Sequence, residues 1–159
     1  MSKTIVVYYS FEGNTKFIAE YISETLGADL LALKPVKEIG THGFMKYIWG
    51  GHQAVMRKKP QLHSYDFDPR SYDTIILGSP VWAGTFSPPV RTFIDENEIS
   101  GKKVGFFCCH EGGKGKIMKT AEDIFSNENE YLGGMDIIAP LTREDFSFDA
   151  FVKELPDYG

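Results

Sequence analysis

A chain of 159 residues, 42% of them hydrophobic and 25% charged, can bury a sizeable core, and this composition excludes an intrinsically disordered protein. Its formal net charge of −5 argues against nucleic acid as a partner. No apolar stretch approaches the length of a membrane span, and the apolar run near the N-terminus is too short for a secretory signal. We therefore expect a single cytoplasmic domain over residues 1–159 that has no contact with membranes.

Five short apolar runs along the chain predict β-strands. Each run is mostly continuous and rich in β-branched or aromatic residues, as is typical of strands that are buried on both faces. The runs lie at Ile5–Tyr9, Leu30–Leu33, Thr74–Leu77, Val104–Cys109 and Ile137–Leu141.

Between these runs, apolar residues recur at helical spacing. The first helix is predicted over Phe17–Leu26, with Gly27 placed to end it. A second is expected around Phe44–Met56, although Gly50 and Gly51 weaken its middle. Three more are expected after Ser87-Pro88-Pro89, over Ile117–Phe125 and over Phe148–Leu155.

Five strands that alternate with five helices predict an α/β fold with a doubly wound, five-stranded parallel sheet and helices on both faces. In such a sheet the ligand crevice lies at the carboxyl ends of the strands. Three glycine-containing loops are expected to meet at that edge, namely Ser10–Thr15, Ser79–Phe86 and His110–Gly115.

The first of these loops has the character of a phosphate site. It joins a buried strand to a helix N-terminus, where free N–H groups and the helix dipole favour an anion. The alternative is an ordinary turn in which Asn14 or Thr15 caps the helix. The turn contains neither the Gly-Lys-Ser/Thr of nucleoside triphosphate sites nor the G-x-G-x-x-G of dinucleotide sites.

Together the loops resemble those of the flavodoxin family, in its short-chain form. Ser10-x-Glu12-Gly13-Asn14-Thr15 is similar to the family's phosphate loop, and the segment from Gly78 to Gly84 is similar to its second flavin loop. The resemblance implies strand order 2-1-3-4-5, an FMN cofactor and electron transfer. It further implies a set of cofactor-binding residues: Ser10, Glu12, Gly13, Asn14, Thr15, Ser79, Pro80, Val81, Trp82, Ala83, Gly84, His110, Gly112 and Gly113.

Trp82 is the candidate for stacking on the flavin ring, and the alternative is that it packs into the core beneath its loop. By the same resemblance, Gly84 could supply a flexible peptide near the flavin. The third loop has no aromatic residue of the kind that many flavodoxins place over the other face of the ring. Either another aromatic residue covers that face, or the face is open to a hydride donor or a small acceptor.

The remaining polar and cysteine residues of the third loop leave several interpretations open. His110 could tune the flavin, or it could be a solvated loop residue. Cys108 and Cys109 are expected to be reduced, small buried residues rather than a redox pair or, with His110 and Glu111, a metal site. The basic, aromatic segment from Lys46 to Lys59 could receive a partner, or it could be a solvated helix face.

The leading hypothesis for function is a flavodoxin that shuttles electrons between redox partner proteins, with the chemistry carried by FMN and no catalytic side chain. The alternative is an FMN-dependent oxidoreductase that takes hydride from NAD(P)H and reduces a quinone-type acceptor. A non-catalytic binding module on the same fold is the third possibility.

Overall fold

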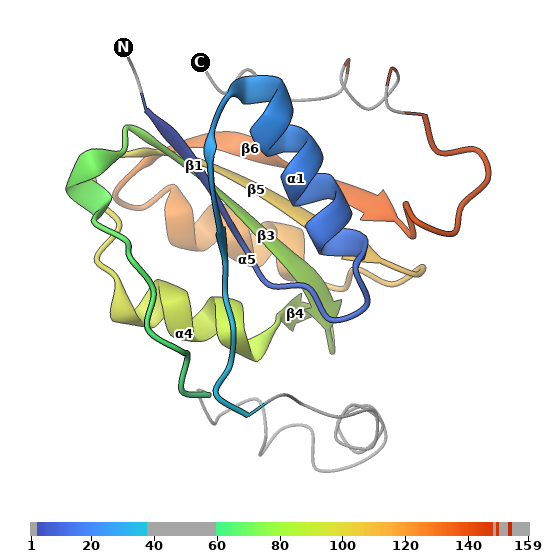
Figure 1. Ribbon diagram of the computed structural model, residues 1–159, viewed down its shortest axis with the longest axis horizontal. Helices are drawn as coiled ribbons and strands as arrows, with labels where there is room; N and C mark the ends of the chain where they lie inside the picture. The colour runs from blue at the N-terminus through green and yellow to red at the C-terminus, as the bar shows by residue number, and fades with distance from the viewer. Residues whose placement is uncertain (1–2, 38–59, 148, 150–152, 154–159) are drawn as a thin grey trace.

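The structure is a computed structural model that describes residues 3–37, 60–147, 149 and 153 (Figure 1). Its sheet has five parallel strands in the order β2-β1-β3-β5-β6. When only these parallel strands are counted along the chain, β5 is the fourth and β6 the fifth, so the predicted order 2-1-3-4-5 is confirmed. Their bounds are β1 Thr4–Tyr8, β2 Asp29–Ala32, β3 Thr74–Trp82, β5 Lys103–His110 and β6 Glu130–Ile138. A short sixth strand, β4 (Thr85–Phe86), pairs antiparallel with the end of β3 and was not predicted.

Helices cover both faces of the sheet, as predicted. Helix α1 (Asn14–Leu26) lies on one face, and α4 (Pro88–Glu96) and α5 (Ile117–Phe125) lie on the other (Figure 1). A 3₁₀ turn, η1 (Pro69–Ser71), precedes β3. The helix expected at Phe44–Met56 and the segment Lys46–Lys59 lie outside the described residues. Of the helix expected at Phe148–Leu155, only Asp149 and Lys153 are described, and both are helical.

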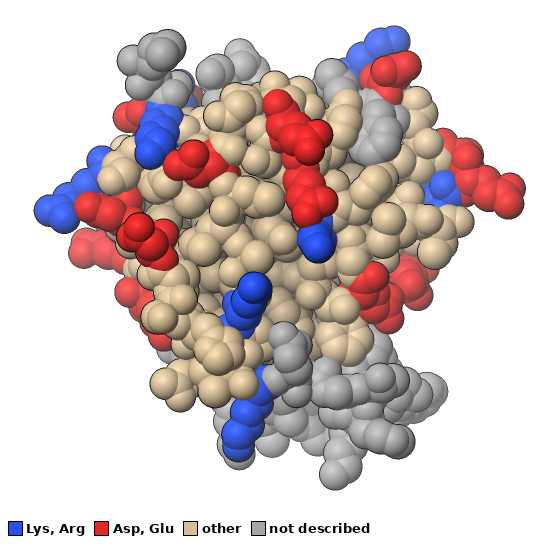
Figure 2. Space-filling model, in the orientation of Figure 1, with Lys and Arg blue, Asp and Glu red and all other residues tan. Residues whose placement is uncertain are grey.

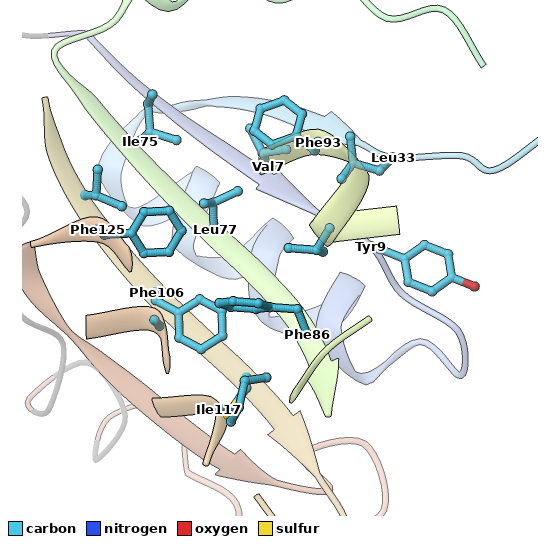
Figure 3. Close-up of a cluster of buried hydrophobic side chains, with 14 of the residues drawn as sticks. Val7, Tyr9, Leu33, Ile75, Leu77, Phe86, Phe93, Phe106, Ile117 and Phe125 are labelled. Atoms are coloured by element: carbon cyan, nitrogen blue, oxygen red, sulfur yellow. The ribbon is translucent and has the colours of Figure 1, made fainter. Parts of the chain in front are cut away.

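The core is divided by the sheet into two hydrophobic layers. Beneath α1, the buried residues Ile18 and Ile22 pack against Val6 and Ile76. The opposite layer is larger and aromatic, and Figure 3 shows Phe86, Phe93, Phe106 and Phe125 gathered around the central strands. Phe86 and Phe106 meet edge to face, with ring centroids 5.3 Å apart.

Local sequence accounts for the ends of α1 and for the start of α4. Gly13 and Gly27 flank α1 and both adopt left-handed backbone conformations, with φ of 100° and 63°, which glycine tolerates best. At α4, Pro88 and Pro89 occupy the first turn, where a missing N–H is harmless. Ser87 has the extended backbone of an N-cap residue, but its side chain does not cap the helix.

The largest corrections to the predicted strands concern β3 and β6. Strand β3 continues through Trp82 instead of ending at Leu77, so most of the predicted second loop is strand and hairpin. Strand β6 begins at Glu130 and ends at Ile138, whereas the sequence predicted Ile137–Leu141. The strand was not predicted over its full length because it contains poor strand formers, namely Gly133, Gly134 and Asp136. It forms because eight of its residues pair with residues of β5.

Figure 2 shows acidic and basic side chains interspersed around one face of the molecule, with no continuous basic stripe among the described residues of that face. In the described part of the chain, no helix has the length and apolarity needed to cross a membrane.

Candidate functional site

The three predicted loops converge on one cavity of about 230 Å³ at the carboxyl ends of β1, β3 and β5. This is the edge of the sheet where open α/β folds bind their ligands. The cavity is lined by Ser10, Phe11, Glu12, Asn14, Thr15, Pro80, Val81, Trp82, Cys109, His110, Glu111 and Gly113.

One end of the cavity is the N-terminus of α1. The Gly13 N–H donates to Ser10 Oγ over 3.1 Å, which holds the turn that leads into the helix. No side chain caps α1, so the capping role considered for Asn14 or Thr15 is not seen. Thr15 is 1% exposed and lines the cavity, and no acidic residue occupies the first helical turn. The dipole and N–H groups of this turn favour an anion.

A segment that follows β6 packs against the same turn, although the sequence did not indicate it. The Leu141 N–H donates to Asn14 Oδ1 over 3.1 Å. A side chain at Gly13 would meet the Leu141 Cδ1 atom at 3.2 Å. The first loop is therefore held from outside by the chain after β6 as well as from within by Ser10.

Aromatic side chains form the wall of the cavity. Trp82 makes edge-to-face contacts with Tyr9 and Phe11, with centroid separations of 6.1 and 5.8 Å. It lines the cavity and is 3% exposed, so it belongs to both the core and the cavity wall. Phe11 is half-buried and brings a second aromatic ring to the cavity, from the first loop rather than the third.

The loop that follows Trp82 is a two-residue hairpin. Ala83 and Gly84 have φ of 51° and 76°, the pattern of a type I′ turn, and Trp82 pairs with Thr85. Gly84 lies against Gly115 of the third loop, and a Cβ added at Gly115 would be 2.5 Å from the Gly84 Cα. The second and third loops therefore touch through their backbones.

The third loop is tied to β6 through Asp136. His110, at the end of β5, has a side chain that is only 7% exposed, so it is not a solvated loop residue. Its Nε2 lies 3.1 Å from Asp136 Oδ2, and Lys114 Nζ lies 3.2 Å from the other carboxylate oxygen. Burial raises the pKa of Asp136, but hydrogen bonds from His110 and Lys114 outweigh burial and leave that pKa below its ordinary value.

The two adjacent cysteines lie on opposite faces of the sheet and are both buried and free. Cys108 Sγ contacts Met118 Sδ at 3.6 Å, whereas Cys109 faces α1 and the cavity. Burial raises the pKa of the Cys109 thiol to about 12, so the thiol is protonated and unreactive at neutral pH. Within the described ranges, no three His, Cys, Asp or Glu side chains are grouped to hold a metal ion.

The structure brings most, but not all, of the predicted site residues to the cavity wall. Predicted residues outside the lining are Gly13, Ser79, Ala83, Gly84 and Gly112. Ser79 is fully buried, and its Oγ accepts the Ser87 N–H at 3.0 Å, which anchors the segment that precedes α4.

Three residues at the site were not singled out from the sequence as site residues, namely Phe11, Cys109 and Asp136. Phe11 lies within the first predicted loop and Cys109 lies next to the third, so their positions in the sequence could have indicated them. No local sequence signal indicated Asp136, because it comes close to His110 only through the pairing of β5 with β6.

A second depression, of about 710 Å³, lies at the opposite edge of the sheet, where β3, β5 and β6 begin. Its lining mixes Lys102 and Lys103 with Asp73, Glu128 and Glu130. None of the three predicted loops contributes to it, and the amino ends of parallel strands are not where such folds bind ligands.

Known structures and a curated relative resemble this chain. A protein from Bacteroides eggerthii is 21% identical with a TM-score of 0.75, covering 86% of this chain and 89% of that chain. A flavoprotein crystallised in complex with FMN, from Lactobacillus acidophilus, is 22% identical with a TM-score of 0.71, covering 86% and 93%. A curated relative named NAD(P)H dehydrogenase (quinone), from Archaeoglobus fulgidus, is 27% identical over 130 residues, covering 72% of this chain but only 66% of that relative.

The structural likeness agrees with a match at the level of sequence families. A family model described as Flavodoxin matches residues 3–137, which include all three loops, every strand up to β6 and the wall of the cavity. The chain belongs to the flavodoxin family.

Proposed function

We propose that this protein binds FMN in the cavity between the three loops and passes electrons between redox partner proteins. The observation that carries the proposal is the convergence of an uncapped helix N-terminus and an aromatic wall on one cavity. Membership of the flavodoxin family supports it, as does the likeness to the flavoprotein from Lactobacillus acidophilus that was crystallised with FMN.

The donors at the end of the cavity formed by α1 fit a phosphate group. The first turn of α1 offers N–H groups and the positive end of the helix dipole, and the Ser10 and Thr15 hydroxyls lie on the same wall. Gly13, the N-cap residue of α1, has a φ of 100°, which is strained for other residues. A glycine there would also let the backbone approach the phosphate closely. These residues would hold the phosphate without an arginine.

The other end of the cavity fits a flat, apolar ring. Trp82 and Phe11 would contact the isoalloxazine and exclude water, and the third loop with His110 and Gly113 would border it. When bound, FMN supplies one- and two-electron redox chemistry, which no side chain of this site can supply.

The cavity is smaller than the roughly 300–1,000 Å³ of typical small-molecule sites, so it cannot enclose all of FMN as it stands. Because Trp82 is packed edge-on against Phe11 and Tyr9, we expect its indole to shift when the ring binds. This shift would convert an edge-to-face contact within the protein into contact with the cofactor.

The second candidate is an FMN-dependent oxidoreductase that takes hydride from NAD(P)H. It is favoured by the curated relative from Archaeoglobus fulgidus, whose name is NAD(P)H dehydrogenase (quinone). It is favoured further by the third loop, where exposed Glu111 and glycines leave room for a second substrate at the cavity mouth.

Titration of the purified protein with FMN tests the proposal directly. We expect saturable quenching of flavin fluorescence, and much weaker binding of riboflavin, which lacks the phosphate. Equal affinity for the two flavins would contradict the assigned phosphate end, and absence of any binding would overturn the proposed function.

Anaerobic reduction separates the two candidates. A carrier should not be bleached by NADH or NADPH alone and should accept single electrons from a chemical reductant. Rapid bleaching by either nucleotide, with turnover on a quinone, would establish the oxidoreductase instead.

Replacing Trp82 with Ala should weaken FMN binding by about tenfold or more, since an aromatic contact and its buried area are lost. Trp82→Phe is the matched control, because it keeps a ring in the same wall and should retain most of the affinity. Both affinities come from flavin fluorescence, and thermal unfolding shows whether each variant is folded. Wild-type affinity in a folded Trp82→Ala protein would mean that Trp82 belongs to the core alone.

A further inference from the structure

The third loop is closed on itself by hydrogen bonds that converge on one histidine and one carboxylate. The Gly112 N–H donates to His110 Nδ1 over 3.0 Å. On the other side of the ring, His110 Nε2 lies 3.1 Å from Asp136 Oδ2, and Lys114 reaches the same carboxylate at 3.2 Å. The start and the end of the loop are thus anchored to one residue of β6.

These contacts determine where the proton of His110 lies. A backbone N–H can only donate, so Nδ1 must be the unprotonated nitrogen of the ring. The neutral imidazole then carries its proton on Nε2 and donates it to Asp136. The opposite tautomer would break the bond to Gly112, and a doubly protonated ring would break it too.

We propose that His110 is a positioning residue that shapes the ring end of the cofactor site by accepting the Gly112 N–H, and that Asp136 selects the tautomer able to do so. His110 and Gly113 both line the cavity, on either side of the residue that is held. Gly112 has a φ of 134°, a conformation that L side chains rarely adopt, so the bond holds a backbone geometry specific to glycine. The part of this proposal that concerns FMN rests on the proposed function.

Three charged groups lie around the His110 ring. Asp136 on β6 contacts the ring directly, Lys114 neutralises part of that carboxylate, and Glu111 lies in the same loop. A proton on Nδ1 would remove the acceptor that the Gly112 N–H needs, and the loop would lose the bond that shapes it.

Two substitutions separate the two hydrogen bonds of His110. In His110→Asn, the amide oxygen can accept the N–H two residues further on, as in an Asx turn, but it cannot reach Asp136. In His110→Gln, the longer side chain can reach Asp136, but it offers no acceptor in the Nδ1 position. We expect His110→Gln to bind FMN about tenfold more weakly than wild type, and His110→Asn to stay within about threefold of it. Equal affinities of the Asn and Gln variants for FMN would overturn the proposal while leaving FMN binding itself intact.

A second measurement needs no cofactor. Long-range ¹H–¹⁵N correlations of the ligand-free protein at neutral pH should show one histidine with its proton on Nε2 that is missing from the spectrum of His110→Asn. A proton on Nδ1 of His110 would overturn the proposal even if the variants failed to fold. Failure of the wild type to bind FMN would instead count against the proposed function.

Discussion

At the scale of single residues, two of the loops at the cavity meet through a close contact between two glycines. Gly84, in the hairpin after Trp82, touches Gly115, at the end of the third loop. Both have positive φ values, 76° and 55°. A Cβ at Gly115 would lie 2.5 Å from the Gly84 Cα, whereas a Cβ at Gly84 would lie 3.4 Å from the Gly115 Cα, which is an ordinary contact. The close approach of the two loops therefore depends on the absence of a Cβ at Gly115.

Substituting Gly115 with Ala should destabilise the protein by more than the strain of its backbone conformation alone. A Cβ there would be 2.5 Å from the Gly84 Cα and 3.1 Å from its carbonyl oxygen, so the hairpin would have to move. Gly101→Ala is the matched control, because Gly101 has a similar φ of 68° with nothing within 4 Å of the added Cβ. We expect Gly101→Ala to lower the free energy of unfolding by about 1 kcal/mol, and Gly115→Ala by about 2–3 kcal/mol.

Urea denaturation of the two variants measures this difference, and FMN titration shows whether the loops have shifted. Equal losses of stability, with unchanged FMN affinity in Gly115→Ala, would mean that the contact between the loops is unimportant.

At the scale of elements, the central strands β3 and β5 pack closely because an aromatic ring of β5 lies over a glycine of β3. Gly78 of β3 pairs with Phe107 of β5, and the Phe107 ring lies over the glycine. A Cβ at Gly78 would be 2.1 Å from the Phe107 Cζ. Both residues are buried, so the Phe107 ring cannot move aside without displacing neighbouring core side chains.

We expect Gly78→Ala to destabilise the protein by about 1–3 kcal/mol through overpacking. Phe107→Leu alone should also destabilise it, because the smaller side chain leaves a cavity. The double variant should lose less stability than the sum of the two single variants, since the smaller side chain frees space for the added methyl group. Chemical denaturation of all four proteins gives the coupling energy, and strict additivity would contradict the packing described here.

At the scale of the whole molecule, the sheet brings the first helix turn, the hairpin and the third loop to one edge. The first turn is held by Leu141, 127 residues away from Asn14 in the sequence. The third loop is held by Asp136, 26 residues away from His110. Binding of a ligand at this edge should therefore stabilise the whole fold rather than one loop.

FMN at about 100 times its dissociation constant should stabilise the folded state by about 2.7 kcal/mol and raise the melting temperature by about 5–10 °C. Riboflavin at the same concentration should raise it less, because the N–H groups at the start of α1 would gain no phosphate. Thermal unfolding followed by circular dichroism provides the measurement. A melting temperature that does not respond to FMN would contradict a site formed by all three loops.

The sequence alone determined the alternating strands and helices and the three loops that meet at the cavity, and its resemblance to the flavodoxin family implied the order of the parallel sheet. The elements could be predicted because hydrophobic periodicity and turn glycines act over a few neighbouring residues. Only the tertiary structure decided that β3 runs on into a hairpin, that Trp82 packs against Phe11, and that β6 begins at Glu130. It also decided that Asp136 orients His110, because the register between two strands brings together residues that no local pattern links.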